Sequence, residues 1–241
     1  MQRWLIIMDS VNSYHPKNTT SSATSVSSAF ANLIEARTVL EKKHFVSTGA
    51  ITYIEGDIAE VEISEWDLFH LGDPLKVIIY SPIGILNFES TVVAKGFGSV
   101  IILVPPNIQS RFLDKRQYPR VDARQIGNLH RIHQSTASKS SLEFDSPIPI
   151  ETTDISLGGV GFIVPMDAQE FKTYSRIEGE LQIGFAFGAL LEIIRKSPVE
   201  GGMFYGAKML ELSQEQEFSL RAFILRIQVS NYFKHKSTNN S

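Results

Sequence analysis

The sequence predicts a mainly β protein made of two β-rich blocks and a C-terminal α-helix. Three features indicate this fold class. Short runs of β-branched and aromatic residues recur between turn signals, two consecutive prolines interrupt them near the middle of the chain, and the last apolar residues have helical spacing behind a capping sequence. A chain of 241 residues can hold two domains that each bury a core.

The chain begins with a polar segment. Residues 9–28 are rich in Ser, Thr and Asn and contain few large apolar residues. We therefore expect residues 1–28 to form a flexible leader. The next segment, Ser28–Leu40, is compatible with two structures, because Phe30, Leu33 and Ile34 fit one face of a helix while its end has β-like composition.

The first β-rich block, expected to be a domain over residues 29–106, contains six short runs with strand composition: Arg37–Leu40, Phe45–Tyr53, Ile58–Ile63, Leu75–Tyr80, Leu86–Val93 and Ser99–Val104. Turn signals separate them at Glu55-Gly56-Asp57 and Pro82-Ile83-Gly84. Short strands joined by tight turns predict a small antiparallel barrel. Glu55 and Asp57 are expected to be turn and solubility residues at a hairpin tip.

Pro105-Pro106 ends the first block, because prolines cannot donate to a β-ladder. Residues 107–122 form a charged connector, and a second domain is expected over residues 123–235, before a tail at residues 236–241. Its strand-like runs are Ile148–Ser156, Val160–Val164, Glu180–Ala186, Leu190–Arg195 and Met203–Leu210.

The C-terminal helix should start at Ser213, because Ser213 and Gln216 have capping-box spacing. An apolar stripe follows at helical intervals and is expected to pack against the second block, although it could instead face a partner. Its members are Phe218, Ala222, Leu225, Val229 and Tyr232.

The connector carries a basic motif, Lys115-Arg116-Gln117-Tyr118-Pro119-Arg120. The planar fork of arginine can bind phosphate oxygens or the O6/N7 edge of guanine with two hydrogen bonds. Pro119 disfavours a helix here. In an extended chain Arg116 and Arg120 would share a side, roughly 13 Å apart, which suits a large ligand.

A second motif, Asp154-Ile155-Ser156-Leu157-Gly158-Gly159, supplies complementary groups. Asp154 can accept hydrogen bonds from the N1–H and N2–H₂ groups of guanine, and Ser156 can donate or accept. Gly158 and Gly159 would allow backbone approach that a Cβ would block. The two motifs together suit a ligand with phosphates and purine edges.

The residues of these two motifs resemble PilZ domains, which are receptors for the bacterial second messenger cyclic di-GMP. The RxxxR pattern of the family is matched by Arg116 and Arg120, and its [D/N]xSxxG pattern by Asp154, Ser156 and Gly159. Lys115 stands where family members often carry another basic residue. The resemblance extends over roughly Arg111–Lys234, and the region before it looks more loosely like the N-terminal domain of flagellar-brake, YcgR-like proteins.

This resemblance implies two small antiparallel β-barrel domains, the first split-barrel-like and the second PilZ-like, with the helix at the end. It implies cyclic di-GMP as the ligand, contacted by the five motif residues and secondarily by Arg111, Lys115 and Gly158. The expected output is control of the flagellar motor through a stator or rotor protein, with ligand binding reorienting the two domains.

Two other interpretations stay open. The arginines could be solvated connector charges and Asp154–Gly159 a plain hairpin turn, so that the chain would be a structural or adaptor protein with a degenerate, ligand-free site. Its output could also be exopolysaccharide synthesis. We expect no enzyme activity, since Gly159-Val160-Gly161 lacks the third glycine of a dinucleotide loop, and no metal site, since His130 and His133 lack further ligands.

Composition agrees with a small anionic ligand. The formal charge is −3 and the pI about 6.1, which disfavours general nucleic-acid binding. Residues 111–133 nevertheless carry a net charge of +4, which leaves −7 on the rest. The absence of cysteine is compatible with a reducing compartment, and no apolar run is long enough to span a bilayer, so we expect a cytoplasmic protein.

Overall fold

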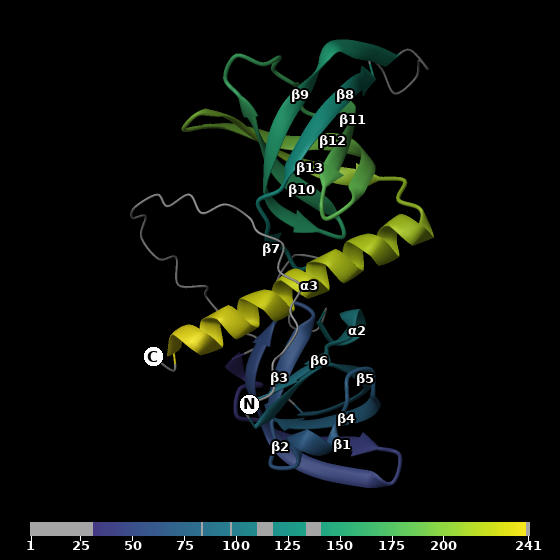
Figure 1. Ribbon diagram of the computed structural model, residues 1–241, viewed down its shortest axis with the longest axis vertical. Helices are drawn as coiled ribbons and strands as arrows, with labels where there is room; N and C mark the ends of the chain where they lie inside the picture. The colour runs from purple at the N-terminus through teal and green to yellow at the C-terminus, as the bar shows by residue number, and fades with distance from the viewer. Residues whose placement is uncertain (1–30, 83, 97, 110–117, 134–140, 240–241) are drawn as a thin grey trace, which may run out of the picture.

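The computed structural model describes residues 31–82, 84–96, 98–109, 118–133 and 141–239. The expected flexible leader, residues 1–28, lies outside these ranges. Two antiparallel β-barrels stand one above the other with a long helix between them (Figure 1). The mainly β fold with a C-terminal helix, predicted from the sequence, is confirmed.

The first barrel closes in the order β1-β2-β3-β6-β5-β4. A short 3₁₀ helix, η1 (Trp66–Leu68), lies between its third and fourth strands. The strands are β1 (Arg37–Lys42), β2 (Phe45–Glu55), β3 (Ile58–Glu62), β4 (Pro74–Ser81), β5 (Gly84–Gly96) and β6 (Ser99–Leu103). Alternate residues of β4 are buried, as expected when one face of a strand lines a core. Of the segment Ser28–Leu40, which was compatible with helix or strand, the part Arg37–Leu40 lies in strand β1.

The second barrel consists of the ring β10-β13-β12-β11-β8-β9, closed by pairing between β9 and β10, with the short β7 added beside β9. Its core is rich in aromatic residues, including Phe162, Phe187 and Tyr205. The strands are β7 (Val121–Asp122), β8 (Ile126–His133), β9 (Ser141–Ser156), β10 (Gly159–Pro165), β11 (Arg176–Gln182), β12 (Ala186–Val199) and β13 (Gly202–Leu210).

The strands of the second barrel differ from the sequence expectation at β7, which lies in the expected connector, at β8 and at β11. β8 was not expected, because Asn128, His130 and Arg131 interrupt its apolar residues. β11 starts and ends earlier than expected: Gly184 adopts φ +93° in the turn to β12, which only glycine tolerates without strain. The other expected runs overlap observed strands, with shifted ends.

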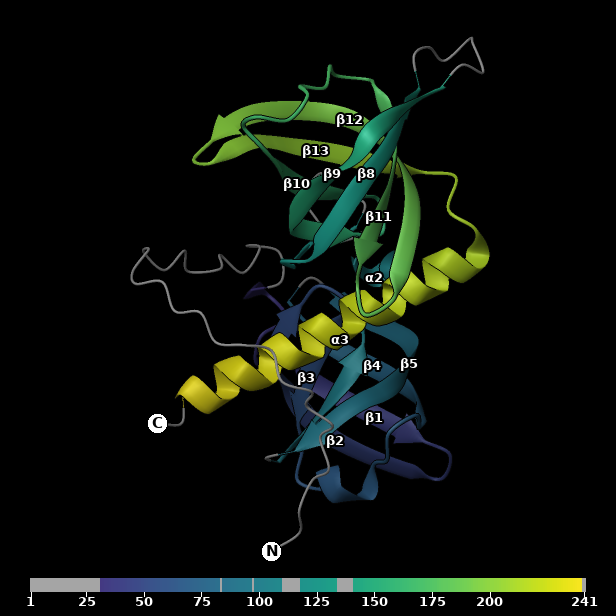
Figure 2. The same ribbon diagram turned by 45° about the horizontal axis from the view of Figure 1, so that its top comes forward.

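The helix α3 (Gln214–Asn239) contacts both barrels. Its first half contributes Leu220, Phe223 and Ile224 to the core of the second barrel. Its second half packs on the outer face of the first barrel, where Tyr232 joins Ile58. Both views show the helix crossing between the barrels, and a second short helix, α2 (Pro106–Gln109), lies beside it (Figure 2). One helix therefore ties the two barrels together.

Candidate functional site

The Asp154–Gly159 motif forms the end of a β-hairpin. Ser156, the last residue of β9, pairs with Gly159, the first residue of β10, across a two-residue turn. β7 pairs with β9 on its other side, so that Val121 lies opposite Ile155 and Asp122 opposite Asp154. This pairing brings the end of the connector next to the hairpin.

Arg120 directly precedes β7 and lies against Asp154. Its Nη1 atom is 3.2 Å from Asp154 Oδ1. The side chain of Arg120 is 40% exposed and that of Asp154 is 19% exposed, so the pair is reachable from solvent. The structure thus joins a residue of the basic motif to one of the acidic motif, 34 positions apart.

The second carboxylate oxygen of Asp154 is also engaged. Thr153 Oγ1 donates a hydrogen bond to Asp154 Oδ2 over 3.0 Å. The same oxygen lies over Gly161, where a Cβ would come within 2.3 Å of it. Thr153 and Gly161 were not expected at this site. A signal for Gly161 does exist in the sequence, because a hairpin turning at Leu157-Gly158 places it opposite Asp154.

The remaining motif residues hold the turn together. Ser156 is buried and donates to the carbonyl of Gly159 over 3.3 Å. A Cβ at Gly158 would lie 2.9 Å from Cδ2 of Tyr118, so the aromatic ring packs on this glycine. A Cβ at Gly159 would lie 2.2 Å from the carbonyl oxygen of Ala207 on β13. The space beside Gly159 is therefore filled by the neighbouring strand, and a ligand contact there stays a prediction.

Arg111, Lys115 and Arg116 lie outside the described residues, so their expected place in the site stays a prediction. Among the described basic residues near the motif, Arg124 extends into solvent and pairs with Glu151 over 3.4 Å. The hairpin thus offers a carboxylate and a guanidinium side by side. Partly exposed ion pairs contribute about 0–1 kcal/mol to stability, so a ligand can displace the contact between Arg120 and Asp154 at little cost in free energy.

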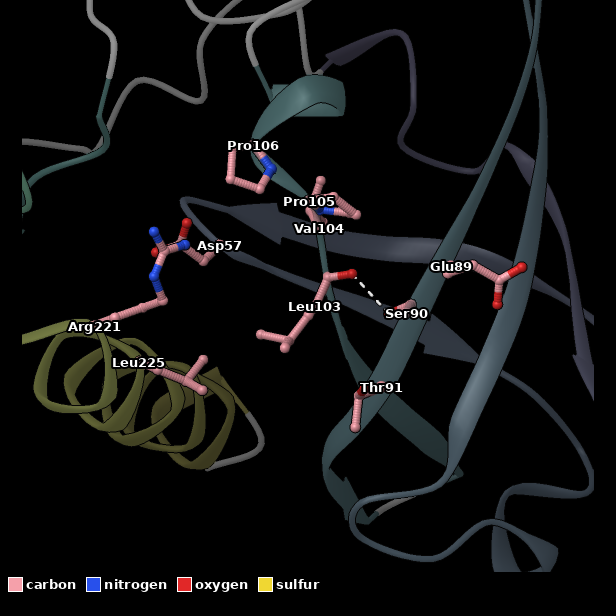
Figure 3. A pocket seen from close by; sticks show the side chains of 10 residues that line it. All are labelled: Asp57, Glu89, Ser90, Thr91, Leu103, Val104, Pro105, Pro106, Arg221 and Leu225. Carbon is pink, nitrogen blue, oxygen red and sulfur yellow. Dashed lines mark hydrogen bonds between the residues drawn. The ribbon is translucent and has the colours of Figure 1, made fainter. Parts of the chain in front are cut away.

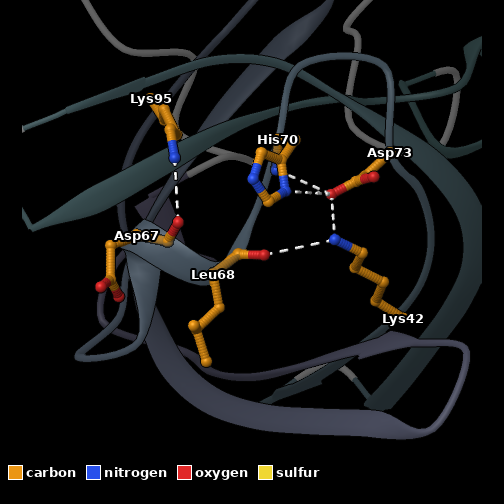
Figure 4. A network of polar contacts seen from close by, with 6 residues as sticks. All are labelled: Lys42, Asp67, Leu68, His70, Asp73 and Lys95. Carbon is orange, nitrogen blue, oxygen red and sulfur yellow. Dashed lines mark hydrogen bonds and ion pairs between the residues drawn. The ribbon is translucent and has the colours of Figure 1, made fainter.

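A separate polar network lies at one end of the first barrel (Figure 4). Lys42 contacts Asp73 and donates to the carbonyl of Leu68 over 3.2 Å, while the backbone N–H of His70 donates to Asp73 over 2.7 Å. The hydrogen bond from Lys42 lowers the pKa of Asp73. These contacts fasten η1 and the following loop to β1, which is a structural role.

Within the described ranges, no cluster of His, Asp or Glu side chains could hold a metal ion. No helix in the described part of the chain is long and apolar enough to cross a membrane.

Comparison with known proteins identifies a domain that includes this hairpin. The PilZ domain family matches residues 114–226. A comparison with curated proteins gives no significant match.

Several solved structures are similar to this chain. Bacillus subtilis inhibitor of motility (MotI/DgrA) is 14% identical with a TM-score of 0.39, and the match covers 82% of this chain and 97% of that one. Escherichia coli YcgR in complex with c-di-GMP is 15% identical with a TM-score of 0.40, covering 85% and 88%. The K. pneumonia MrkH–c-di-GMP complex is 10% identical with a TM-score of 0.33, covering 85% and 90%.

The family match spans the two motifs, and the barrel that carries them has Arg120 and Asp154 in contact at its hairpin. Residues 114–226 of this chain therefore match the PilZ domain family.

Proposed function

We propose that this chain is a receptor for cyclic di-GMP. The observation that carries the proposal is the contact between Arg120 and Asp154 at the rim of a PilZ-domain barrel. Arg120 offers planar donors to a phosphate or to the O6/N7 edge of guanine, and Asp154 offers acceptors to the N1–H and N2–H₂ groups of the same base. A cyclic dinucleotide with two guanines presents both sets of groups.

In this proposal the ligand replaces the contact between Arg120 and Asp154 with contacts of its own. Arg116, four residues before Arg120, would supply a second guanidinium, and Lys115 and Arg111 would add positive charge near the phosphates. Ser156, Gly158 and Gly159 would shape the turn on which the base lies. The role of the protein is then binding and conformational signalling, without catalysis.

Titration calorimetry with cyclic di-GMP tests the proposal. The parent chain should bind, and Arg120→Ala should weaken binding about fivefold to a hundredfold, because a bidentate contact to guanine contributes roughly 1–3 kcal/mol. Arg116→Ala should have a similar effect. Arg124→Ala is the matched control, because Arg124 is a nearby exposed arginine that pairs with Glu151 instead of Asp154.

The outcomes separate the open interpretations. Loss of binding in Arg120→Ala but not in Arg124→Ala supports the receptor. A parent chain that does not bind cyclic di-GMP would favour the adaptor with a degenerate site. Equal affinities of the parent, Arg116→Ala and Arg120→Ala would place the ligand elsewhere.

We further propose a two-domain effector, with a YcgR-like domain at residues 29–106, a connector at 107–122 and the PilZ unit at 123–235. Ligand binding would change the orientation of the two domains, and a stator or rotor protein of the flagellar motor would recognise the change. This output rests on the flagellar-brake resemblance of the N-terminal half. The two barrels and the helix between them give ligand binding a physical route to the first barrel.

Overproduction in a swimming bacterium that makes cyclic di-GMP tests the output. Swimming should decrease with the parent chain and stay unchanged with Arg120→Ala. Capture of polysaccharide-synthesis proteins without a motor protein, together with normal swimming, would redirect the output to exopolysaccharide and leave the receptor proposal standing.

A further inference from the structure

Three successive residues, Tyr118, Pro119 and Arg120, touch both halves of the molecule. Tyr118 packs on Gly158 of the β9–β10 hairpin, named the ligand hairpin for its proposed role, and Arg120 pairs with Asp154. Pro119, between them, faces the first barrel: its Cβ lies 3.6 Å from the position of a Cβ built on Gly56. Pro119, the neighbour of the proposed ligand residue Arg120, therefore lies close to the tip of the β2–β3 hairpin of the other domain.

The tip of that hairpin is a meeting point for three segments. Asp57 accepts a hydrogen bond from Gln109 Nε2 of α2 over 2.7 Å and one from Gln228 Nε2 of α3 over 3.1 Å. Gln109 and Gln228 are 2% and 6% exposed, so both amides are buried at this contact. Asp57 was expected only as a turn and solubility residue, and it also joins the tip to both helices.

A side chain at position 56 would have no room at this contact. The φ of Gly56, +59°, favours glycine, and a Cβ there would lie 2.4 Å from Gln228 Nε2. The absence of a side chain thus allows Gln228 to approach the tip. Gly72, in the same barrel, also has a positive φ, of +83°, but a Cβ there would meet nothing within 4 Å.

The side-chain amide of Gln228 uses only part of its hydrogen-bonding capacity at the contact with Asp57. Gln228 Oε1 is buried and has no hydrogen-bond partner among the residues that the structure describes, although buried polar atoms in proteins are nearly always paired. Its amide cannot turn over, because the oxygen would then face the carboxylate of Asp57. A cavity of about 310 Å³ adjoins the contact, between Arg221 and Leu225 of α3 and the end of β6 (Figure 3). Within the described part of the chain, α3 therefore has one buried acceptor without a donor and a cavity beside it.

We propose that Gly56, Asp57 and Gln228 form an interdomain joint that couples the ligand hairpin to α3. The proposal rests on the proposed binding of cyclic di-GMP at Arg120 and Asp154. A ligand that draws Arg120 away from Asp154 also moves Pro119, whose ring restricts the backbone. Pro119 lies close to Gly56 at the tip of the β2–β3 hairpin. Its movement would therefore alter the contact between this tip and Gln228, and with it the packing of α3 on the first barrel. The three residues are positioning residues and do not touch the ligand.

Coupling between two sites is reciprocal, so a change at the joint should alter ligand affinity. Gly56→Ala and Gly72→Ala form a matched pair in the full chain: both place alanine at a positive φ, but only Gly56→Ala crowds Gln228. Calorimetry with cyclic di-GMP should show a change of about fivefold or more in the dissociation constant of Gly56→Ala. Gly72→Ala should bind as the parent does.

Small-angle scattering with and without cyclic di-GMP provides a readout that a purely structural role would not move. Ligand should change the profiles of the parent and Gly72→Ala, and Gly56→Ala should lose most of that change. Gln228→Ala gives a second test without backbone strain, should Gly56→Ala fail to fold. It too should diminish the ligand-induced change, whereas Ser230→Ala, an exposed position on the same helix, should retain it.

The results distinguish the proposal of the joint from the proposal of cyclic di-GMP binding on which it rests. If the parent binds cyclic di-GMP and both Gly56→Ala and Gln228→Ala match their controls in affinity and scattering, the joint is refuted and the receptor stands. If the parent does not bind, the receptor and the ligand coupling fail together. Altered affinity and scattering in Gly56→Ala and Gln228→Ala, with unaltered Gly72→Ala and Ser230→Ala, support the joint.

Discussion

Asp154 already has two donors in this structure, Arg120 Nη1 on one oxygen and Thr153 Oγ1 on the other. The sequence predicted Asp154 and Arg120 as ligand residues from their chemistry. It did not predict that they contact each other, because that contact depends on β7 pairing with the end of β9. A guanine base bound as proposed would therefore compete with groups of the chain itself for this carboxylate.

Asp154→Asn removes the charge of Asp154 but keeps one hydrogen-bond acceptor, whereas Asp154→Ala removes both. Asparagine keeps one acceptor oxygen and should retain part of the affinity for cyclic di-GMP, whereas alanine leaves guanine donors unpaired and should weaken binding about fivefold to a hundredfold. Calorimetry measures both. Equal affinities for the two variants would contradict a guanine contact at Asp154, and melting curves should show little change in stability, since the ion pair is partly exposed.

The roles of the two hairpin glycines, Gly158 and Gly159, could not be predicted from the sequence. Gly158 and Gly159 are neighbours in one motif, yet one faces Tyr118 and the other faces Ala207 of β13. Neither partner is close in sequence, so the two roles could not be distinguished before the barrel was known. The clash at Ala207 means that Gly159→Val alters the barrel itself, whatever it does to the ligand.

At the scale of elements, α3 was the best predicted in one respect and the worst in another. The capping box is confirmed by both hydrogen bonds, from Gln216 N–H to Ser213 Oγ and from Ser213 N–H to Gln216 Oε1. The single apolar stripe was wrong for Phe218 and Ala222, which are exposed. The helix packs against two barrels on two faces, so no one stripe describes it.

Ser213→Ala should lower the free energy of unfolding by about 1 kcal/mol, because the first turn of α3 loses a hydrogen-bond acceptor. Urea denaturation followed by circular dichroism measures the loss. Ser230→Ala, an exposed position inside the same helix, is the control and should change stability by no more than a few tenths of a kcal/mol. An unchanged midpoint for Ser213→Ala would show that packing alone fixes the start of the helix.

At the scale of the whole molecule, the sequence predicted two β domains because alternation and turn residues are local signals. Their relation to each other was not predicted. It depends on a few polar contacts between distant residues, such as Tyr232 Oη donating to Glu60 over 2.5 Å and Lys236 pairing with the same carboxylate. Such partners leave no periodic pattern in a single sequence.

Glu60 should make the domain contact sensitive to acid. Burial raises the pKa of Glu60, but hydrogen bonds from Lys236, Ser99 and Tyr232 outweigh burial, so the pKa lies below its ordinary value of 4.5. A lowered pKa stabilises the folded state above the unfolded value, and this stabilisation is lost as pH falls through the folded value. The free energy of unfolding should therefore decrease below about pH 4.5, with Asp73 contributing at still lower pH.

Urea denaturation between about pH 3.5 and about pH 7 measures this dependence. Glu60→Gln should lower stability near pH 7 by about 1–3 kcal/mol and reduce the decrease in acid, because the charged acceptor is gone. Glu89→Gln, at an exposed glutamate of the same barrel, should behave as the parent does. An acid dependence that is the same in the parent and Glu60→Gln would exclude Glu60 as its source.

The place of α3 in the chain has a consequence for biosynthesis. Because α3 follows both barrels, the first barrel leaves the ribosome and can close long before the helix that covers it has been made. Until then Ile58, Ala94 and Ile101, which pack against Tyr232 in the finished protein, form an apolar patch open to water and to chaperones. Nascent chains that stop before α3 should therefore aggregate more readily than the finished protein, even though each of their strands is already made.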